Sequence, residues 1–421
     1  MSDGQYTAIV HVGHLFDGLT GALKSKVSIL ICGDRIQAIA PTDSVCRELP
    51  PHTDIFDFQP YYAMPGFIDT HTHMSLAGDG RVYSQMFSDS DEMMMLIGVM
   101  NLQRHLAAGI TTIREHGARN RVGFILKEGI QRGYISGPRM LVSGRPITCT
   151  GGHFHMCNEV ADGEEEIRRS VRRLVHEGAD YIKIMASGGG TEGTFPGRAS
   201  YTIEELHAAV HEAHHFHRLT AAHCRASESM IRAIKAGIDL IEHAEFLDSD
   251  DQLRFDPKIA EMMTESGIWI SPTLQAWTNY PRIMDLKNRL EKGTITPNEE
   301  QELSALEQRA ELRLDIVRRM LDYGLLQRIV PGTDSGVNNI AFGHLDYDLQ
   351  LLVRVGFTPE QAILAATRIS AEAAGQDKDI GTIEPGKIAD FVLVDKEPTA
   401  DILNFSRVVA VFQGGRKVFQ P

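Results

Sequence analysis

The sequence lacks three patterns that would place the chain outside the ordinary globular class. No apolar run comes close to the length of about 20 residues that a membrane-spanning helix needs. The start, MSDGQYTAIV, lacks the basic segment and the following apolar segment of a secretory signal peptide. The five cysteines are an odd number without C-x-x-C spacing, which argues against a disulfide framework and for a reducing compartment. We therefore expect a cytoplasmic protein that has no membrane partner.

Positive charge is also scarce. Lys and Arg number 42 against 56 Asp and Glu, which gives a formal net charge of -14. Nucleic acids and anionic membranes repel such a chain, so we expect a small-molecule partner and no nucleic acid. The 421 residues, 43% hydrophobic and 23% charged, fit one large domain with a smaller one.

The two chain ends share a β-like pattern. Near the N-terminus the runs YTAIVHVG and VSILICG alternate with Gly, Asp and Pro, and near the C-terminus FVLVD and VVAVF flank the turn signal QGG. Because chain termini often lie close together, we expect residues 1–63 and 385–421 to build one small β-sandwich domain.

The middle of the chain alternates apolar strand-like runs with longer helical patterns. Examples are GFIDTHTH, YIKIMAS and LIEHAEF, which are followed by amphipathic stretches such as EEEIRRSVRRLVHEG. The longest helix is expected to start at Thr296 as N-cap, with Glu299 completing a capping box, and to end at Gly324. Eight such units predict an α/β fold, a (β/α)8 barrel of the TIM type over residues 64–384. A doubly wound sheet is the alternative, but no G-x-G-x-x-G follows a strand.

His71 and His73 form an H-x-H at the end of the first barrel strand, GFIDTHTHM. Side chains two positions apart on a strand share one face, so both imidazoles can point into one cavity. Two surface histidines paired by chance would give the same pattern. The place of the motif at the C-terminal end of a barrel strand favours a metal site, because barrel chemistry occurs on that face.

Four further residues end later strands of the expected barrel. Lys183 lies inside the buried run YIKIMAS, where a lysine is costly unless it is neutralised, paired or modified. It either reaches out to solvent at the strand end or carries a CO2-derived carbamate. His223, His243 and Asp334 each allow a structural role, as a hydrogen-bonded histidine or a turn-forming aspartate. Together with the H-x-H they predict a metal site at the barrel mouth.

These motifs resemble the amidohydrolase superfamily, in particular its imidazolonepropionase- and prolidase-like branch with a carboxylated lysine. The resemblance rests on PGFIDTHTH, GITTIRE, KIMASGGG, AAHCRASESMIRAIKAGIDLIEHAEFLD, PGTDSG and the tail LAATRISAEAAGQDKDIGTIEPGKIADFVLVD, which cover nearly the whole chain. It implies that His71 and His73 bind the more buried metal, that carbamylated Lys183 bridges two metals, and that His223 and His243 bind the second. Asp334 would touch the buried metal and shuttle the proton.

The implied chemistry is hydrolysis of an amide-type C–N bond. Two divalent cations can share a bridging hydroxide and lower its pKa toward neutrality. Imidazole and carboxylate-type ligands suit Zn²⁺, with Mn²⁺ or Co²⁺ as alternatives. Relatives are often homo-oligomers, so the resemblance also implies a homo-oligomer.

Two residues are candidates for substrate contacts. His153 follows paired glycines in TGGHFH and matches a substrate-binding position of the family, although it could also be a surface loop residue. Arg225 lies two residues after His223, where dipeptidase-like relatives usually have Tyr or His. Its guanidinium could clamp a substrate carboxylate, or it could pair with Glu245 as structure. The histidines of EAHHFH fall on a helix away from the mouth and are expected at the surface.

The favoured substrate is a dipeptide or an N-acyl amino acid. Three alternatives stay open: hydrolysis of a xenobiotic carbamate, urea or aryl amide, opening of a heterocyclic ring, and a catalytically inactive scaffold. The presence of every expected ligand type speaks against the scaffold.

Overall fold

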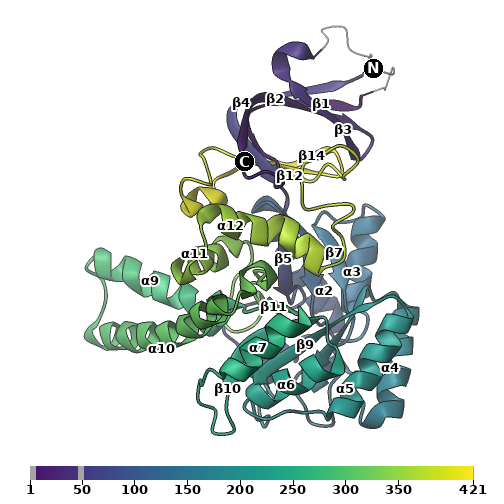
Figure 1. Cartoon of the computed structure of the whole chain (residues 1–421), viewed down its shortest axis with the longest axis vertical. Helices are drawn as coiled ribbons and strands as arrows, with labels where there is room; N and C mark the ends of the chain where they lie inside the picture. The colour runs from purple at the N-terminus through teal and green to yellow at the C-terminus, as the bar shows by residue number, and fades with distance from the viewer. Residues whose placement is uncertain (1–5, 46–51, 421) are drawn as a thin grey trace.

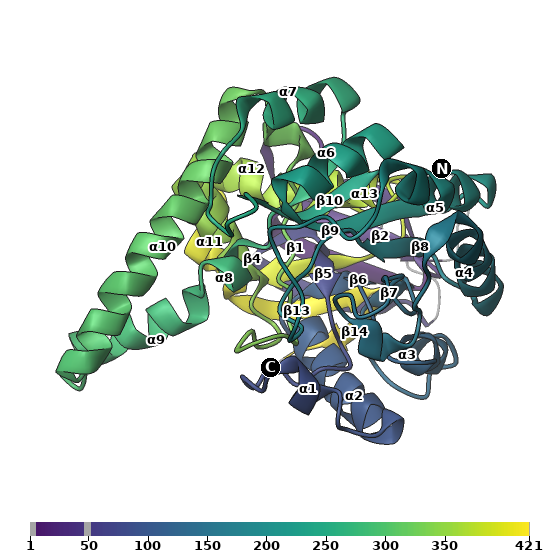
Figure 2. The same ribbon diagram turned by 90° about the horizontal axis from the view of Figure 1, so that it is seen from below.

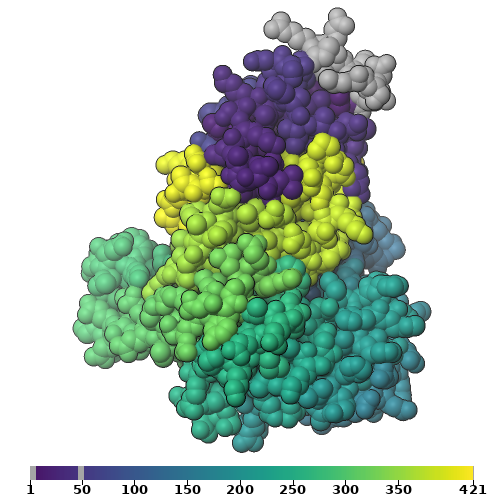
Figure 3. Space-filling view, viewed as in Figure 1, coloured from purple at the N-terminus to yellow at the C-terminus, as the bar shows by residue number. Residues whose placement is uncertain are grey.

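The computed structural model describes residues 6–45 and 52–420. Residues 1–5, 46–51 and 421, which include Cys46 and parts of the expected terminal domain, lie outside the described residues. A curled sheet lies at one end of the molecule, next to a larger body of strands and helices (Figure 1). In the space-filling view the first and last segments of the chain pack together at that end (Figure 3). Within the described ranges, no helix combines the length and apolarity needed to cross a membrane.

Both chain ends contribute to one seven-stranded sheet. In order across the sheet the strands are β14 (Arg416–Phe419), β13 (Val408–Gln413), β12 (Phe391–Val394), β4 (Asp54–Pro65), β1 (Ala8–Phe16), β2 (Leu23–Cys32) and β3 (Arg35–Pro41). The two ends meet where β12 runs antiparallel to β4, with Leu393 opposite Ala63. The apolar core of this part includes Val10, Ile29 and Phe412. The expected pairing of the chain ends is confirmed, and its strands form one continuous sheet.

The hairpin between β13 and β14 shows how the sequence favours the pairing of these two strands. Gly414 and Gly415 both have positive φ, 55° and 75°, and Gln413 pairs with Arg416 across the turn. A two-residue turn with two positive φ values matches the twist of antiparallel strands and favours glycine at both positions. The QGG signal of the sequence is therefore a tight turn.

The larger body is a closed barrel. Three of its strands form one sheet, β5 (Phe67–Thr72), β6 (Ile110–Glu115) and β7 (Arg139–Val142), and four form another, β8 (Tyr181–Met185), β9 (Leu219–Ala226), β10 (Leu240–Leu247) and β11 (Trp269–Ser271). A parallel bridge between Ile147 and Ile184 joins the two sheets. Residues 329–335 take the eighth strand position, because Ile329 pairs with Ile270 and Ser335 pairs with Thr72. The predicted (β/α)8 barrel is confirmed.

Helices surround the barrel strands, most of them on the outside of the barrel (Figure 2). They are α1 (Tyr83–Met86), α2 (Asp91–Ala107), α3 (Val122–Gln131), α4 (Gly163–Glu177), α5 (Ile203–His215), α6 (Ser227–Ala236), α7 (Pro257–Ser266), α8 (Leu274–Trp277), α9 (Tyr280–Glu291), α10 (Pro297–Asp322), α11 (Leu345–Val355), α12 (Pro359–Leu364) and α13 (Ser370–Ala373). The longest, α10, begins as predicted, with both hydrogen bonds of the Thr296–Glu299 capping box present. With α9 it forms an arm that extends from one side of the barrel (Figures 1 and 2).

Candidate active site

The H-x-H lies at the C-terminal end of β5, inside the barrel. His71 and His73 are 1% and 3% exposed. The Nδ1 of His71 donates to Glu242 Oε2 at 2.8 Å, and the Nδ1 of His73 donates to Gly117 O at 3.3 Å. Each Nε2 then faces Asp334 Oδ1, at 3.4 Å in both cases. Two imidazoles whose Nε2 atoms turn toward one carboxylate are the arrangement that a divalent cation needs.

Asp334 is held in place by the neighbouring strand. Its N–H donates to His71 O at 2.8 Å, and its backbone has a φ of 56°, which directs the side chain to the histidines. One carboxylate oxygen lies 4.0 Å from His243 Nδ1. Candidate ligand atoms of His71, His243 and Asp334 lie within 4.8 Å of one another. The structure thus brings residues from three strands that are far apart in the sequence into one metal-binding group.

The other predicted ligands surround the same cavity. His223 from β9 and His243 from β10 have ring centroids 4.4 Å apart. Lys183 from β8 is fully buried, and its Nζ has no hydrogen-bond partner among the described residues. A small cavity is lined by these side chains together with His71, His73, Tyr83, His153, Phe154, Met185, Trp277 and Asp334.

Burial sets the charge state of these groups. It lowers the pKa of His71, His223 and His243 well below the ordinary histidine value, so all three are neutral and able to bind a metal. Burial also lowers the pKa of Lys183 to about 8. Although burial raises the pKa of Asp334, the neighbouring His71 and His73 outweigh it and leave that pKa below its usual range. The carboxylate is therefore ionised at neutral pH.

Glu242 is a member of the site that the sequence analysis missed. Besides accepting the hydrogen bond from His71, its other oxygen lies 3.1 Å from His116 Nε2. Candidate ligand atoms of His71, His116 and Glu242 also lie within 4.8 Å of one another. Glu242 and His243 are adjacent, so regular alternation along a strand would turn them to opposite faces. The left-handed φ of 71° at His243 breaks that alternation, and both side chains reach the interior.

Asp69 ties the first strand of the barrel to the last. One oxygen accepts the N–H of His71 at 3.1 Å and that of Thr333 at 3.0 Å, and the other accepts the Thr333 hydroxyl at 2.6 Å. His105 of α2 lies 3.1 Å from the second oxygen. The carboxylate therefore fixes the spacing between the H-x-H and the segment that carries Asp334.

His153 lies in the cavity, as predicted, on the loop after β7. It is 3% exposed, and its ring centroid is 4.6 Å from that of His223. Its Nδ1 is hydrogen-bonded to the hydroxyl of Thr191 at 2.7 Å. No described residue bonds its Nε2, which leaves that nitrogen for a ligand. His155, the other histidine of TGGHFH, bonds Gly152 O instead.

Arg225 makes the pairing with Glu245 that the sequence left open. Its Nε donates to Glu245 Oε2, and its guanidinium lies 4.1 Å above the Trp277 ring. The indole N–H of Trp277 donates to His243 Nδ1 at 2.9 Å. The side chain of Arg225 is thus fixed beside the cavity, and no described residue accepts a hydrogen bond from its two terminal NH2 groups.

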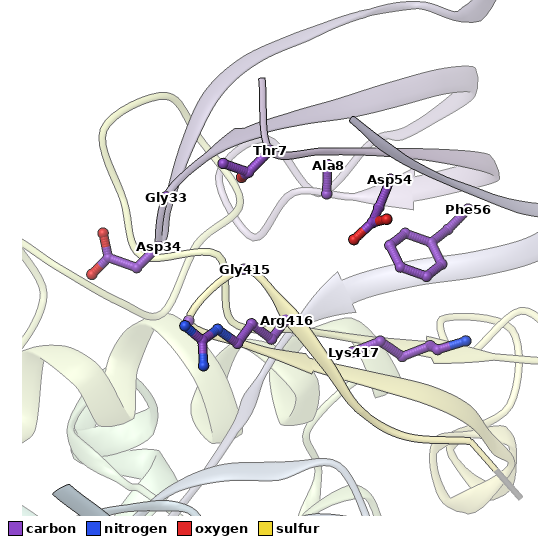
Figure 4. A pocket seen from close by; sticks show the side chains of 10 residues that line it. Thr7, Ala8, Gly33, Asp34, Asp54, Phe56, Gly415, Arg416 and Lys417 are labelled. Carbon is purple, nitrogen blue, oxygen red and sulfur yellow. The ribbon is translucent and has the colours of Figure 1, made fainter. Parts of the chain in front are cut away.

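The histidines of EAHHFH lie away from this site, as expected. His214 pairs with Asp239 at 2.8 Å, and within residues 6–45 and 52–420 the close groups of metal-ligating atoms contain none of these helix histidines. A second hollow lies in the terminal sheet, where Asp34, Arg416 and Lys417 line it (Figure 4). Charges of both signs meet there, and it contains none of the predicted site residues.

Comparison with known proteins identifies the family. Residues 62–418 match the amidohydrolase family. The chain is 26% identical over 451 residues to ochratoxinase of Aspergillus niger, covering 99% of this chain and 87% of that protein. The crystal structure of a Xaa-Pro dipeptidase with bound methionine superposes with a TM-score of 0.82 and 26% identity, over 98% of this chain and 100% of the other. A prolidase complexed with N-methylphosphonate-L-proline gives a TM-score of 0.79 and 25% identity over the same shares of the two chains. The chain therefore belongs to the amidohydrolase family and is a metal-dependent hydrolase of C–N bonds.

Proposed function

We propose that the chain hydrolyses the amide bond of a small substrate that bears a free carboxylate, most simply a dipeptide or an N-acyl amino acid. The observation that carries the proposal is Arg225, a guanidinium fixed by Glu245 and Trp277 beside the candidate metal ligands, with its terminal nitrogens unused. A planar pair of N–H groups matches a carboxylate in geometry and charge. The similar dipeptidase and prolidase structures support a dipeptide-like substrate.

The buried side chains fit two divalent cations. His71, His73 and Asp334 would hold one, His223 and His243 the other, and Lys183 would bridge them as a carbamate. The neutral histidines and the ionised aspartate suit Zn²⁺. Bound cations supply a hydroxide nucleophile at neutral pH and polarise a carbonyl.

Lys183 suits the bridging role because its amine is buried and lacks a partner among the described residues. A pKa of about 8 leaves about a tenth of the amine unprotonated at pH 7, far more than for an ordinary lysine. The free amine adds to CO2, its nitrogen loses one proton, and a carbamate anion results. This would replace a buried amine that has no partner among the described residues with an anion, in a cavity that is also lined by His71, His73, His223 and His243.

Asp334 and His153 supply the remaining chemistry. The Asp334 carboxylate accepts a proton as the nucleophile attacks the amide carbon and gives it to the leaving amine nitrogen, acting first as base and then as acid. The free Nε2 of His153 is placed to contact a polar group of the substrate. Arg225 holds the substrate carboxylate and so orients the scissile bond.

The test compares matched substrates. We expect the metal-loaded protein to hydrolyse dipeptides and N-acyl amino acids, and to hydrolyse their C-terminal amides poorly. Arg225→Met should lower kcat/KM for the carboxylates by about 10- to 100-fold, the value of a hydrogen bond between charged groups, and leave the amides nearly unchanged. Arg198→Met, which removes an exposed guanidinium outside the cavity lining, is the control. Equal losses on both substrate classes would contradict the carboxylate clamp.

A further inference from the structure

Tyr83 is a cavity residue to which nothing above gives a role. It lies in the short helix α1, on the irregular segment that follows the H-x-H strand. It is 5% exposed and lines the same cavity as Asp334 and His153. Its position therefore places a phenol among the candidate metal ligands.

Neighbouring rings hold the Tyr83 side chain in one orientation. Its ring makes edge contacts with His153 and Phe154, at centroid distances of 5.4 and 5.5 Å. A side chain at position 190 would collide with it, because a Cβ on Gly190 would lie 2.4 Å from Tyr83 Cε2 and 3.1 Å from its hydroxyl oxygen. A Cβ on Gly189 would likewise lie 2.4 Å from His153 Nε2. The glycine-rich loop after β8 thus has no side chains where these two residues need space.

The hydroxyl of Tyr83 is unused although the residue is buried. No described residue forms a hydrogen bond with it, whereas the hydroxyl of the buried Tyr201 donates to Ala161 O at 2.9 Å. Because Tyr83 lines the cavity, its hydroxyl remains available to a ligand there. Burial raises the pKa of Tyr83 far above its ordinary value, so the phenol remains protonated and able to donate.

We infer that Tyr83 is a further catalytic residue whose hydroxyl donates a hydrogen bond to the amide oxygen as that oxygen gains negative charge in the tetrahedral transition state. His153 lies beside it and contributes its free Nε2 to the same end of the cavity. A donor fixed before the reaction stabilises developing charge without reorganising, which is typically worth about 10²-fold in kcat. The inference rests on the proposed amide hydrolysis and adds a residue to it.

The decisive variant is Tyr83→Phe, which keeps the ring contacts and removes only the hydroxyl. On a substrate that the wild type hydrolyses, we expect kcat to fall by about 10²-fold while KM stays within about twofold. The affinity of the Zn²⁺-loaded protein for a phosphonate analogue of a dipeptide, which presents tetrahedral oxygens, should fall by a similar factor. Gly190→Ala, which crowds the ring, should reproduce both losses. Tyr201→Phe removes a buried hydroxyl outside the cavity lining and should change neither quantity.

Unchanged kcat and unchanged phosphonate affinity in Tyr83→Phe would overturn the inference and leave Tyr83 as a packing residue. The phosphonate measurement needs no turnover. It therefore tests the role of Tyr83 even if the wild type cleaves no amide in the substrate panel. Absence of amide cleavage by the wild type would contradict the proposed function and would leave the binding test of Tyr83 intact.

Discussion

Replacing Glu242 with Gln tests whether a buried carboxylate orients the metal-binding histidine. Glu242 accepts the Nδ1–H of His71 at 2.8 Å, and the pair is fully buried. This bond fixes the tautomer of His71, so that Nε2 is the nitrogen left for a metal. Burial raises the pKa of Glu242 to about 7, so above that pH the acceptor is a carboxylate. A hydrogen bond to a charged acceptor contributes about 1.5–3 kcal/mol against about 1 kcal/mol for a neutral one. Glu242→Gln keeps the shape of the side chain and should therefore cost about 1–2 kcal/mol of metal binding.

The assay is a competition titration of Zn²⁺ between the protein and a fluorescent chelator. We expect Glu242→Gln to weaken binding of the tighter Zn²⁺ by about 5- to 30-fold, a range that overlaps that of other outer partners of metal ligands. Glu177→Gln, which alters an ion pair with Arg145 away from the cavity, serves as the control. Unchanged Zn²⁺ affinity in Glu242→Gln, with an intact fold shown by an unaltered circular dichroism spectrum, would refute this account of His71.

Two further substitutions address the bridge and the proton transfer. Lys183→Ala should abolish hydrolysis, and short carboxylic acids should restore part of it by supplying the missing anion; unchanged activity would rule out the bridge. In the wild type, ¹³CO2 should give a carbamate carbon signal in the NMR spectrum that Lys183→Ala lacks. Asp334→Asn should lower kcat by about 10²- to 10⁴-fold, the usual contribution of a general acid–base group, and a smaller effect would move that role to another residue.

The barrel could be predicted because its strands and helices carry local signals. The capping box at Thr296 and Glu299 and the paired glycines 414 and 415 act within a few residues, and the structure uses them as expected. The eighth strand position was also marked by its motif, IVPGTDS, although only isolated bridges at Ile329 and Ser335 tie it to its neighbours. The terminal sheet needed more than local pattern, because β12 and β4 pair across most of the chain.

The site could be predicted where a residue follows strand alternation. His71 and Lys183 meet in the cavity because they are inward-facing positions on strands, and His73 follows directly after the strand of His71. The strand pattern did not predict Glu242 as a site residue, because the left-handed backbone at His243 places two consecutive side chains inside the barrel. Irregular backbone of this kind depends on tertiary contacts, and a sequence pattern does not encode it.

Tyr83 and Trp277 were missed for a related reason. Both lie on four-residue helices within loops, α1 and α8, where no periodicity indicates which side chain reaches the cavity. Arg225 was found because it shares a strand with His223, but its partner Trp277 could only be seen in three dimensions.

The most direct test of the central claim is metal analysis coupled to activity. Protein purified without chelators should contain up to two divalent metal ions per chain. Removing them should abolish hydrolysis of an N-acyl amino acid, and adding back Zn²⁺ should restore it in proportion to the metal bound up to two equivalents. A protein that binds no metal, and that gains no activity on Zn²⁺ addition, would contradict the account.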